Sequence, residues 1–189
     1  MIDRIVNHRR EFLRGTAAAA IALMAWPVKG VFADTAAQTV TIVPFSNTGE
    51  RQPAAAMPKI VLSEAEWKAK LSPASFAVAR EAGTERPYTG ELLNEHRKGI
   101  FRCICCDTAL FDSATKFDSG TGWPSFWQPI AKENVAEAGD HSLGMDRTEV
   151  KCARCDGHLG HVFDDGPKPT GLRYCMNSVS LHFTPAVAA

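Results

Sequence analysis

The chain has 189 residues, of which 45% are hydrophobic and 22% charged, which suits a soluble globular domain with extensions. Its 21 basic and 21 acidic residues balance, but five of the basic and only two of the acidic residues lie within residues 1–33, so the remainder carries a net charge of −3. This balance argues against nucleic acid as a partner, because nucleic-acid binders carry a basic stripe.

Residues 1–33 predict an export leader. Arg9-Arg10 is a twin-arginine pair, an apolar, Ala-rich run extends from Thr16 to Trp26, and Val31-Phe32-Ala33 offers a small-residue cleavage site. The apolar run is shorter than the ~20 residues that span a bilayer, which favours twin-arginine export over a membrane anchor. We therefore expect a periplasmic or otherwise exported protein, with no stable membrane association once the leader is cleaved.

The next stretch, residues 34–58, is rich in Ala, Thr and Pro. This composition is typical of a linker, although Val40–Phe45 alternates in a way that predicts a short edge strand. The folded domain is expected at residues 59–185.

Two short helices are predicted at the start of this domain. Ser63 and Glu66 form a capping box that begins a helix extending to about Leu71. A second helix begins at Ser72, with Pro73 in its first turn, and is expected to end at Gly83.

From Gly99 onward the pattern changes to short strands separated by Gly and Pro, with no helical periodicity between them. Strands at such close spacing indicate an antiparallel β domain, with the two helices packed on its outside. The predicted strands are Ile100–Cys103, Leu110–Phe111, Lys116–Asp118, Val150–Cys152, His161–Phe163, Arg173–Met176 and Ser180–Phe183.

Four of the six cysteines form two Cys-x-x-Cys pairs, which predict one tetrahedral structural zinc site. The ligands are Cys103, Cys106, Cys152 and Cys155. Two disulfides or a redox-active pair are the alternatives, and the nearby His158 and His161 raise a rival Cys/His site. Disulfides are usual in an exported protein, but twin-arginine substrates cross the membrane already folded, so zinc can occupy the thiolates beforehand.

Cys175 has no Cys-x-x-Cys partner and lies in a segment predicted to be a strand. Arg173 and Asn177, two residues to either side, would share its strand face. A cation there favours a thiolate, and an amide can hold a polar ligand. For a single cysteine, burial as a structural residue is the usual alternative.

Two further segments place histidines near a turn and aromatic side chains in a tight loop. Residues 157–166 contain His158 and His161, and residues 122–127 contain Trp123. A single His or Trp is more often a packing residue. An aromatic loop, a His pair and an unpaired Cys together favour a ligand pocket.

Five motifs standing in order carry a family resemblance, which extends from about Pro58 to Pro185. The chain resembles the B-type peptide-methionine (R)-S-oxide reductases in the motifs Cys103-x-x-Cys106, Lys116-Phe117-Asp118-Ser119-Gly120-Thr121-Gly122-Trp123-Pro124-Ser125-Phe126, Cys152-x-x-Cys155, Gly157-His158-Leu159-Gly160-His161-Val162-Phe163 and Arg173-Tyr174-Cys175-Met176-Asn177-Ser178. The resemblance implies a mainly β fold of two antiparallel sheets, short N-terminal helices, and a structural Zn²⁺ away from the active site. It also implies reduction of the R epimer of methionine sulfoxide in oxidised proteins.

The resemblance further implies the roles of individual residues. Cys175 is then the nucleophile, His158, His161 and Asn177 bind or protonate the sulfoxide, and Trp123 holds the substrate methyl group. Arg173 and Phe183 are assigned to the substrate site as well.

This chain departs from many family members at Thr121, where they carry a cysteine that resolves the sulfenic acid as a disulfide. Three routes remain: an external thiol such as thioredoxin, the spare Cys105 as a displaced resolving thiol, or a glutathione-type adduct. Because Cys105 belongs to a predicted zinc knuckle, we expect the external reductant. A zinc-stabilised binding module and a disulfide oxidoreductase are the alternative functions.

Overall fold

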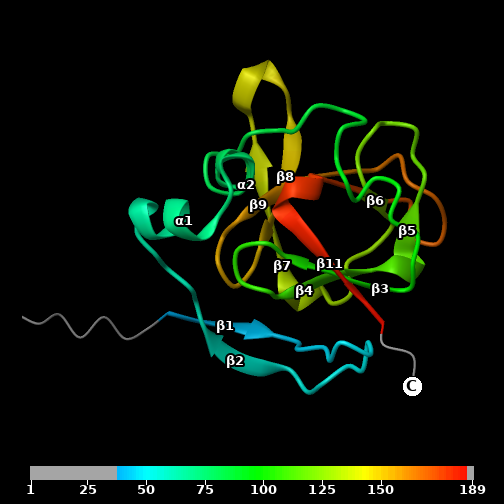
Figure 1. The fold of residues 1–189 in the computed structure, drawn as a ribbon. Coiled ribbons are helices and arrows are strands. Elements are labelled where there is room, and N and C mark those ends of the chain that lie inside the picture. The colour runs from blue at the N-terminus through cyan, green and yellow to red at the C-terminus, as the bar shows by residue number, and fades with distance from the viewer. Residues whose placement is uncertain (1–37, 187–189) are drawn as a thin grey trace, which may run out of the picture. The chain divides into compact units, whose positions relative to one another are not determined.

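The computed structural model describes residues 38–186, except for the side chain of Leu143, so the predicted leader lies outside the described residues. The domain is mainly β and antiparallel throughout (Figure 1). One sheet has six strands, in the spatial order β5 (Lys116–Phe117), β6 (Ser125–Phe126), β10 (Arg173–Met176), β9 (His158–Phe163), β8 (Arg147–Cys152) and β7 (Val135–Asp140). The other has three strands, in the order β11 (Leu181–Pro185), β3 (Gly99–Cys103) and β4 (Ala109–Asp112). The predicted fold class is confirmed.

A third, two-stranded element precedes these sheets. β1 (Thr39–Ile42) pairs with β2 (Ala55–Pro58), so the linker interpretation of residues 34–58 is corrected for the part of the stretch that the structure describes. Val43 after β1 is fully buried, and the Asn134 side chain hydrogen-bonds both its N–H and its C=O at 2.8 Å. The edge strand predicted at Val40–Phe45 overlaps β1, but composition alone suggested a linker because the pairing with β2 and the contacts of Asn134 cannot be read from it.

Both predicted helices form. α1 (Glu64–Lys70) has the expected capping box, in which the Ser63 hydroxyl accepts from the Glu66 N–H and the Glu66 carboxylate accepts from the Ser63 N–H. α2 (Pro73–Ala79) ends before Gly83, where it was expected to end. The glycine is still needed, since a Cβ there would lie 2.8 Å from a backbone oxygen of α2.

The core between the two large sheets is aromatic. Phe111 on β4 stacks on Phe126 of β6 with ring centroids 4.5 Å apart, and Phe101 on β3 meets the same ring edge-on at 4.9 Å. All three rings are fully buried, and burial of each side chain contributes about 1.5–3 kcal/mol. These contacts fix β6, and with it the neighbouring strand β10, against the smaller sheet.

The β7–β8 hairpin, coloured yellow in Figure 1, projects beyond the other strands. Sequence patterning missed β7 because its residues, Val-Ala-Glu-Ala-Gly-Asp, are mostly exposed and have weak strand propensity. The strand is held by six cross-strand pairs to β8. The pairing brings Asp140 opposite Arg147 at the end of the hairpin.

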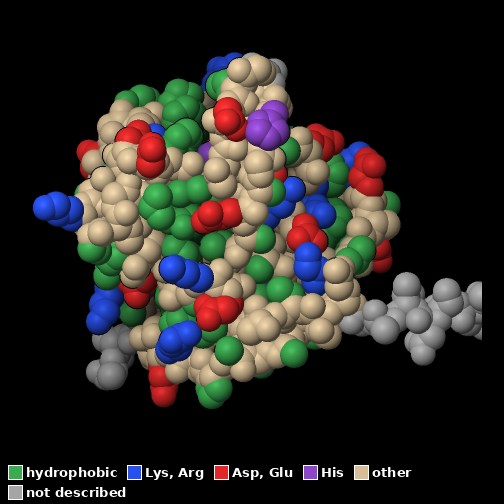
Figure 2. All heavy atoms as spheres, turned by 180° about the vertical axis from the view of Figure 1, so that it is seen from behind, with side chains coloured by type: hydrophobic (Ala, Val, Ile, Leu, Met, Phe, Trp, Pro, Cys, Tyr) green, Lys and Arg blue, Asp and Glu red, His purple; other side chains and the backbone are tan. Residues whose placement is uncertain are grey.

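Basic and acidic side chains are intermixed over the face seen in Figure 2. Within residues 38–186, no helix combines the length and apolar character that crossing a bilayer requires.

Candidate metal centre and active site

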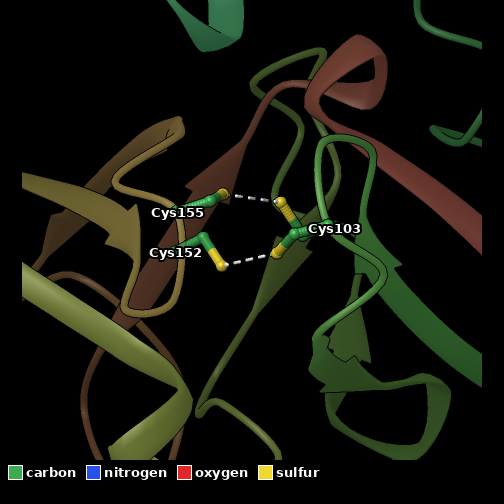
Figure 3. Close-up of side chains that lie close together, drawn as sticks. Cys103, Cys152 and Cys155 are labelled. Carbon is green, nitrogen blue, oxygen red and sulfur yellow. Dashed lines mark hydrogen bonds between the residues drawn. The ribbon is translucent and has the colours of Figure 1, made fainter. Parts of the chain in front are cut away.

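The four cysteines of the two Cys-x-x-Cys pairs converge, although 46 to 52 residues separate the partners in each close contact. Their sulfur atoms all lie within 4.8 Å of one another. Cys103 Sγ is 3.7 Å from Cys155 Sγ, and Cys106 Sγ is 3.5 Å from Cys152 Sγ (Figure 3). Turns with positive φ at Asp107 and Asp156 follow the two pairs.

These distances fit a metal site and do not fit disulfides. A disulfide requires about 2.05 Å between sulfurs, whereas thiolates about 2.3 Å from a tetrahedral zinc ion lie about 3.8 Å from one another. The rival Cys/His arrangement is not favoured, because His158 and His161 each bond to a carboxylate. The cluster can therefore hold one metal ion in a closed site.

Cys105 lies beside this cluster. Its side chain is buried, and a Cβ built on Gly157 would be 3.4 Å from the sulfurs of both Cys105 and Cys155. The spare thiol thus belongs to the metal end of the domain. It does not line the pocket that contains Cys175.

That pocket has a volume of about 120 Å³ and brings together four of the predicted site residues. They are Cys175, His161, Asn177 and Trp123, and the rest of the lining consists of Thr84, Arg147, Gly160 and Phe163. The remaining predicted residues, His158, Arg173 and Phe183, do not line it.

Cys175 lies in the middle of the six-stranded sheet, paired with Ser125 of β6 and His161 of β9. Its Sγ is 3.9 Å from the Thr121 hydroxyl. Burial raises the pKa of the Cys175 thiol, while the Thr121 hydroxyl and the charge of Arg173 act in the opposite direction. The resting side chain is therefore a thiol near neutral pH, and a ligand must help to ionise it.

The two histidines have different surroundings. His161 lines the pocket, and its Nε2 lies 2.7 Å from Asp140 Oδ2. His158 is buried, with Nδ1 2.7 Å from Glu149 Oε1 and no partner for Nε2 among the described residues. Burial lowers the pKa of His158, against the effect of Glu149, so this ring is neutral near pH 7. Their ring centroids are 5.4 Å apart.

Asn177 and Trp123 are both fixed through the segment at Glu85. Asn177 Oδ1 accepts from the Glu85 N–H, and its Nδ2 donates to Leu159 O. The Trp123 indole donates to Glu85 O at 3.1 Å. The Glu85 carboxylate in turn accepts from the N–H groups that follow Asn177, those of Ser178 and Val179. This frame holds the pocket walls in place.

Arg173 stands behind the pocket and does not line it. It donates two hydrogen bonds of 2.8 Å to Asp165 and lies over the Phe163 ring, 4.4 Å from its centroid. Its positive charge still lowers the pKa of the Cys175 thiol, as the sequence predicted. A direct contact with substrate is not supported.

The assignment of Phe183 to the substrate site is wrong. Phe183 lies on β11 of the smaller sheet and packs against Phe101, with ring centroids 5.0 Å apart. The phenylalanine that lines the pocket, together with Trp123, is Phe163, which shares a face of β9 with His161. The i, i+2 spacing of these two residues could have identified it.

Gly160 explains how β9 approaches the nucleophile so closely. A Cβ at this position would lie 2.1 Å from the Cys175 carbonyl oxygen, so only glycine fits. Sequence reasoning did not identify this requirement, nor the pocket-lining Arg147 and Thr84. Both of these come from segments that reach the pocket only through tertiary pairing.

Trp123 also lines a second cavity, of about 440 Å³, next to the first. Its walls include Tyr88, Asn94, Lys116 and Phe117. Trp123 therefore borders both the small pocket that contains Cys175 and a larger groove.

The fold and site together define a thiol-based centre on a β domain with a separate four-cysteine cluster. The SelR domain matches residues 71–185, and the chain belongs to this family. A peptide methionine sulfoxide reductase MsrB of Pseudomonas putida (strain W619) is 60% identical over 129 residues, 68% of this chain and 97% of its own length. An MsrB of Thioalkalivibrio sulfidiphilus is 55% identical over 66% of this chain and 91% of its own, and one of Synechococcus sp. (strain RCC307) is 57% identical over 64% and 89%.

Proposed function

We propose that this protein is a peptide-methionine (R)-S-oxide reductase, which returns the R epimer of methionine sulfoxide in oxidised proteins to methionine. Its family and its MsrB relatives support this activity. The observation that carries the proposal is the position of Cys175, a free thiol outside the metal cluster that lines a small pocket with a histidine and an indole.

The chemistry follows from the pocket residues. The Cys175 sulfur attacks the electrophilic sulfur of the sulfoxide, and the S–O bond breaks as the oxygen passes to Cys175. The products are methionine and a Cys175 sulfenic acid, so the cysteine is oxidised by two electrons while the substrate is reduced by two. His161 is the proposed proton donor to the oxygen, since it lines the pocket and His158 is neutral and buried behind it.

The other pocket side chains offer both apolar and polar contacts to the substrate. Trp123 and Phe163 offer aromatic surface to the S-methyl group, and Asn177 retains an amide hydrogen beyond the one donated to Leu159. The larger groove that Trp123 also borders gives room for the polypeptide around the oxidised residue.

Recycling of the sulfenic acid is proposed to need an external thiol such as thioredoxin. The first thiol displaces water to give a mixed disulfide with Cys175, and a second thiol releases the reduced enzyme. Thr121, beside Cys175, has no sulfur to offer, and Cys105 is buried at the metal cluster.

The test is turnover with a dithiol reductant on the separate R and S epimers of methionine sulfoxide in a peptide. Wild type should convert only the R epimer, and Cys175→Ser should reduce turnover to background. Cys105→Ser should turn over at nearly the wild-type rate. Epimer binding without methionine formation would instead identify a binding module, and loss of turnover in Cys105→Ser with one cycle preserved would make Cys105 the resolving group.

We further propose that the cluster holds a structural zinc ion, to be bound by Cys103, Cys106, Cys152 and Cys155, and that the protein is exported by the twin-arginine route. The sulfur geometry supports zinc, and the Arg9-Arg10 pattern supports export. Metal analysis and N-terminal sequencing of protein from the exported compartment test both. One zinc per chain and a start after Ala33 are expected, whereas disulfides without zinc would overturn the metal assignment.

A further inference from the structure

The carboxylate of Asp140 joins two pocket residues that sequence reasoning left unconnected. Its Oδ2 lies 2.7 Å from His161 Nε2 and accepts a hydrogen bond of 2.7 Å from Arg147 Nη2. Its Oδ1 accepts from the Ser142 N–H at 2.9 Å. The side chains are only 17% exposed for Asp140, 13% for His161 and 22% for Arg147, so this network is largely shielded from water.

Asp140 does not line the pocket, but His161 and Arg147, whose side chains it contacts, both do. The register of the β7–β8 hairpin creates the arrangement, because Asp140 is the cross-strand partner of Arg147. β9, which carries His161, is the next strand of the same sheet. The end of the hairpin thus brings a carboxylate to the back of the active site.

We propose that Asp140 is a positioning residue, which holds His161 as the Nε2–H tautomer and holds Arg147 at the pocket wall. The inference rests on the proposed sulfoxide reduction, because it concerns the histidine that acts on the substrate. It assigns β7, a strand with no role so far, to the support of the active site.

The tautomer follows from the donor and acceptor chemistry. An ionised carboxylate only accepts hydrogen bonds, so His161 Nε2 must carry a proton. The hydrogen bonds from Ser142 and His161, together with the positive charge of Arg147, hold the pKa of Asp140 well below its usual value, which keeps it ionised. Nδ1 is then the nitrogen of His161 that gains or loses a proton during the reaction.

An amide cannot replace this carboxylate. Ser142, His161 and Arg147 direct three donors at the two oxygens of Asp140. Asparagine has one acceptor oxygen, so in either orientation its NH₂ group would face a donor. One orientation turns the NH₂ group toward His161 Nε2, and the other turns it toward the Ser142 N–H, so neither satisfies all three donors. Because Asp140→Asn also loses the negative charge, it should no longer hold His161 in a single tautomer, while the size of the side chain is kept.

The experiment combines ¹⁵N NMR of the histidine rings with single-turnover rates of the reduced full-length protein. Wild type should show His161 as the Nε2–H tautomer, and Asp140→Asn should lose this pattern. The single-turnover rate of Asp140→Asn should fall at least about tenfold, part of the about 10²–10⁴ that a positioned proton donor contributes. Asp140→Glu, which restores two acceptor oxygens, should recover the tautomer and part of the rate.

Asp146→Asn is the matched control. Asp146 lies on the same hairpin tip, is 89% exposed and contacts only the exposed His141 among the ion pairs of the described residues. It should leave the rate and the His161 tautomer unchanged, and all variants should still unfold cooperatively well above the assay temperature.

The proposal is overturned if wild-type His161 is the Nδ1–H tautomer, which can be decided even if Asp140→Asn does not fold. It is also overturned if Asp140→Asn keeps the wild-type rate, or if its rate falls with the tautomer unchanged. A wild type that does not reduce methionine sulfoxide would refute the proposed function, while the NMR comparison would still decide whether Asp140 controls His161.

Discussion

Cys175 is the residue on which the proposed chemistry depends, and its environment sets the pH at which it reacts. Burial raises the pKa of its thiol, and the hydroxyl of Thr121 and the charge of Arg173 oppose that rise. Because the raised pKa keeps the thiol protonated at neutral pH, its alkylation rate should increase as the pH rises past the value for an ordinary cysteine. Removing the cation in Arg173→Gln should raise the pKa further and slow alkylation at pH 7 several-fold.

The measurement is the pH dependence of iodoacetamide labelling, followed by mass mapping of the peptide that contains Cys175. Arg86→Gln is the control, since Arg86 is exposed and does not line the pocket. A labelling pKa that is unchanged or lower in Arg173→Gln would show that Arg173 does not act on the nucleophile.

Gly160 gives a second prediction at this scale. Gly160→Ala would place a methyl carbon 2.1 Å from the Cys175 carbonyl oxygen. The contact is with backbone, so β9 and β10 would have to move apart to relieve it. We expect a loss of at least about 3 kcal/mol in unfolding free energy, at the upper end of the cost of overpacking. Urea unfolding measures it.

Gly139→Ala is the matched variant, because its nearest contact is the far end of the flexible His141 side chain at 3.3 Å. It should change stability by less than about 1 kcal/mol. Equal losses in the two variants would mean that the close approach of β9 to β10 is not what requires glycine.

At the scale of elements, the N-terminal hairpin depends on one buried amide. Asn134 donates to Val43 O and Ala109 O and accepts from Val43 N–H, each at 2.8 Å. Asn134→Ala leaves these three backbone groups buried without partners, at about 1–3 kcal/mol each, so we expect a loss of about 3 kcal/mol or more. Hydrogen exchange should locate the loosening in β1 and β2.

Asn47→Ala is a suitable comparison. Asn47 is an exposed residue of the same N-terminal segment whose amide oxygen accepts one hydrogen bond of 3.2 Å from Arg102. It should cost less than about 1 kcal/mol. Unchanged exchange in β1 and β2 of Asn134→Ala would contradict the assigned role.

The elements also explain which site residues a sequence can reveal. Cys175 lies on β10 and Asn177 follows that strand directly, while His161 lies on β9 and Trp123 in a Gly/Pro loop. The sequence motifs around these four residues are distinctive, so local pattern was enough to select them. Arg147 and Asp140 reach the site through the register of a hairpin whose first strand has no strand-like pattern. Phe183 was misplaced because local alternation does not show which sheet its strand joins or which way its side chain faces.

At the scale of the whole molecule, the same limit applies to the fold. Cap residues predicted the helix starts, and short alternating runs predicted most strands, because both depend on neighbours in the chain. The packing of the two large sheets against each other depends on aromatic rings from β3, β4 and β6. The attachment of the N-terminal β1–β2 hairpin depends on Asn134. Such long-range contacts have no local pattern from which they can be read.

The four-cysteine cluster is the other long-range tie, since it joins the turn after β3 to the turn after β8. Zinc held by four thiolates contributes about 10–16 kcal/mol of apparent binding free energy, as much as the whole stability of a typical domain, about 5–15 kcal/mol. If the cluster holds the proposed zinc ion, Cys152→Ser, or removal of that ion by a strong chelator, should abolish the cooperative thermal transition of the domain and with it all turnover. Zinc content and differential scanning calorimetry, measured on the same samples, test this.

Cys105→Ser, which removes a buried thiol beside the cluster, should keep one zinc per chain and a cooperative transition. If it instead lost its zinc while Cys152→Ser kept it, Cys105 would be the fourth ligand and the paired spacing would have misidentified the site.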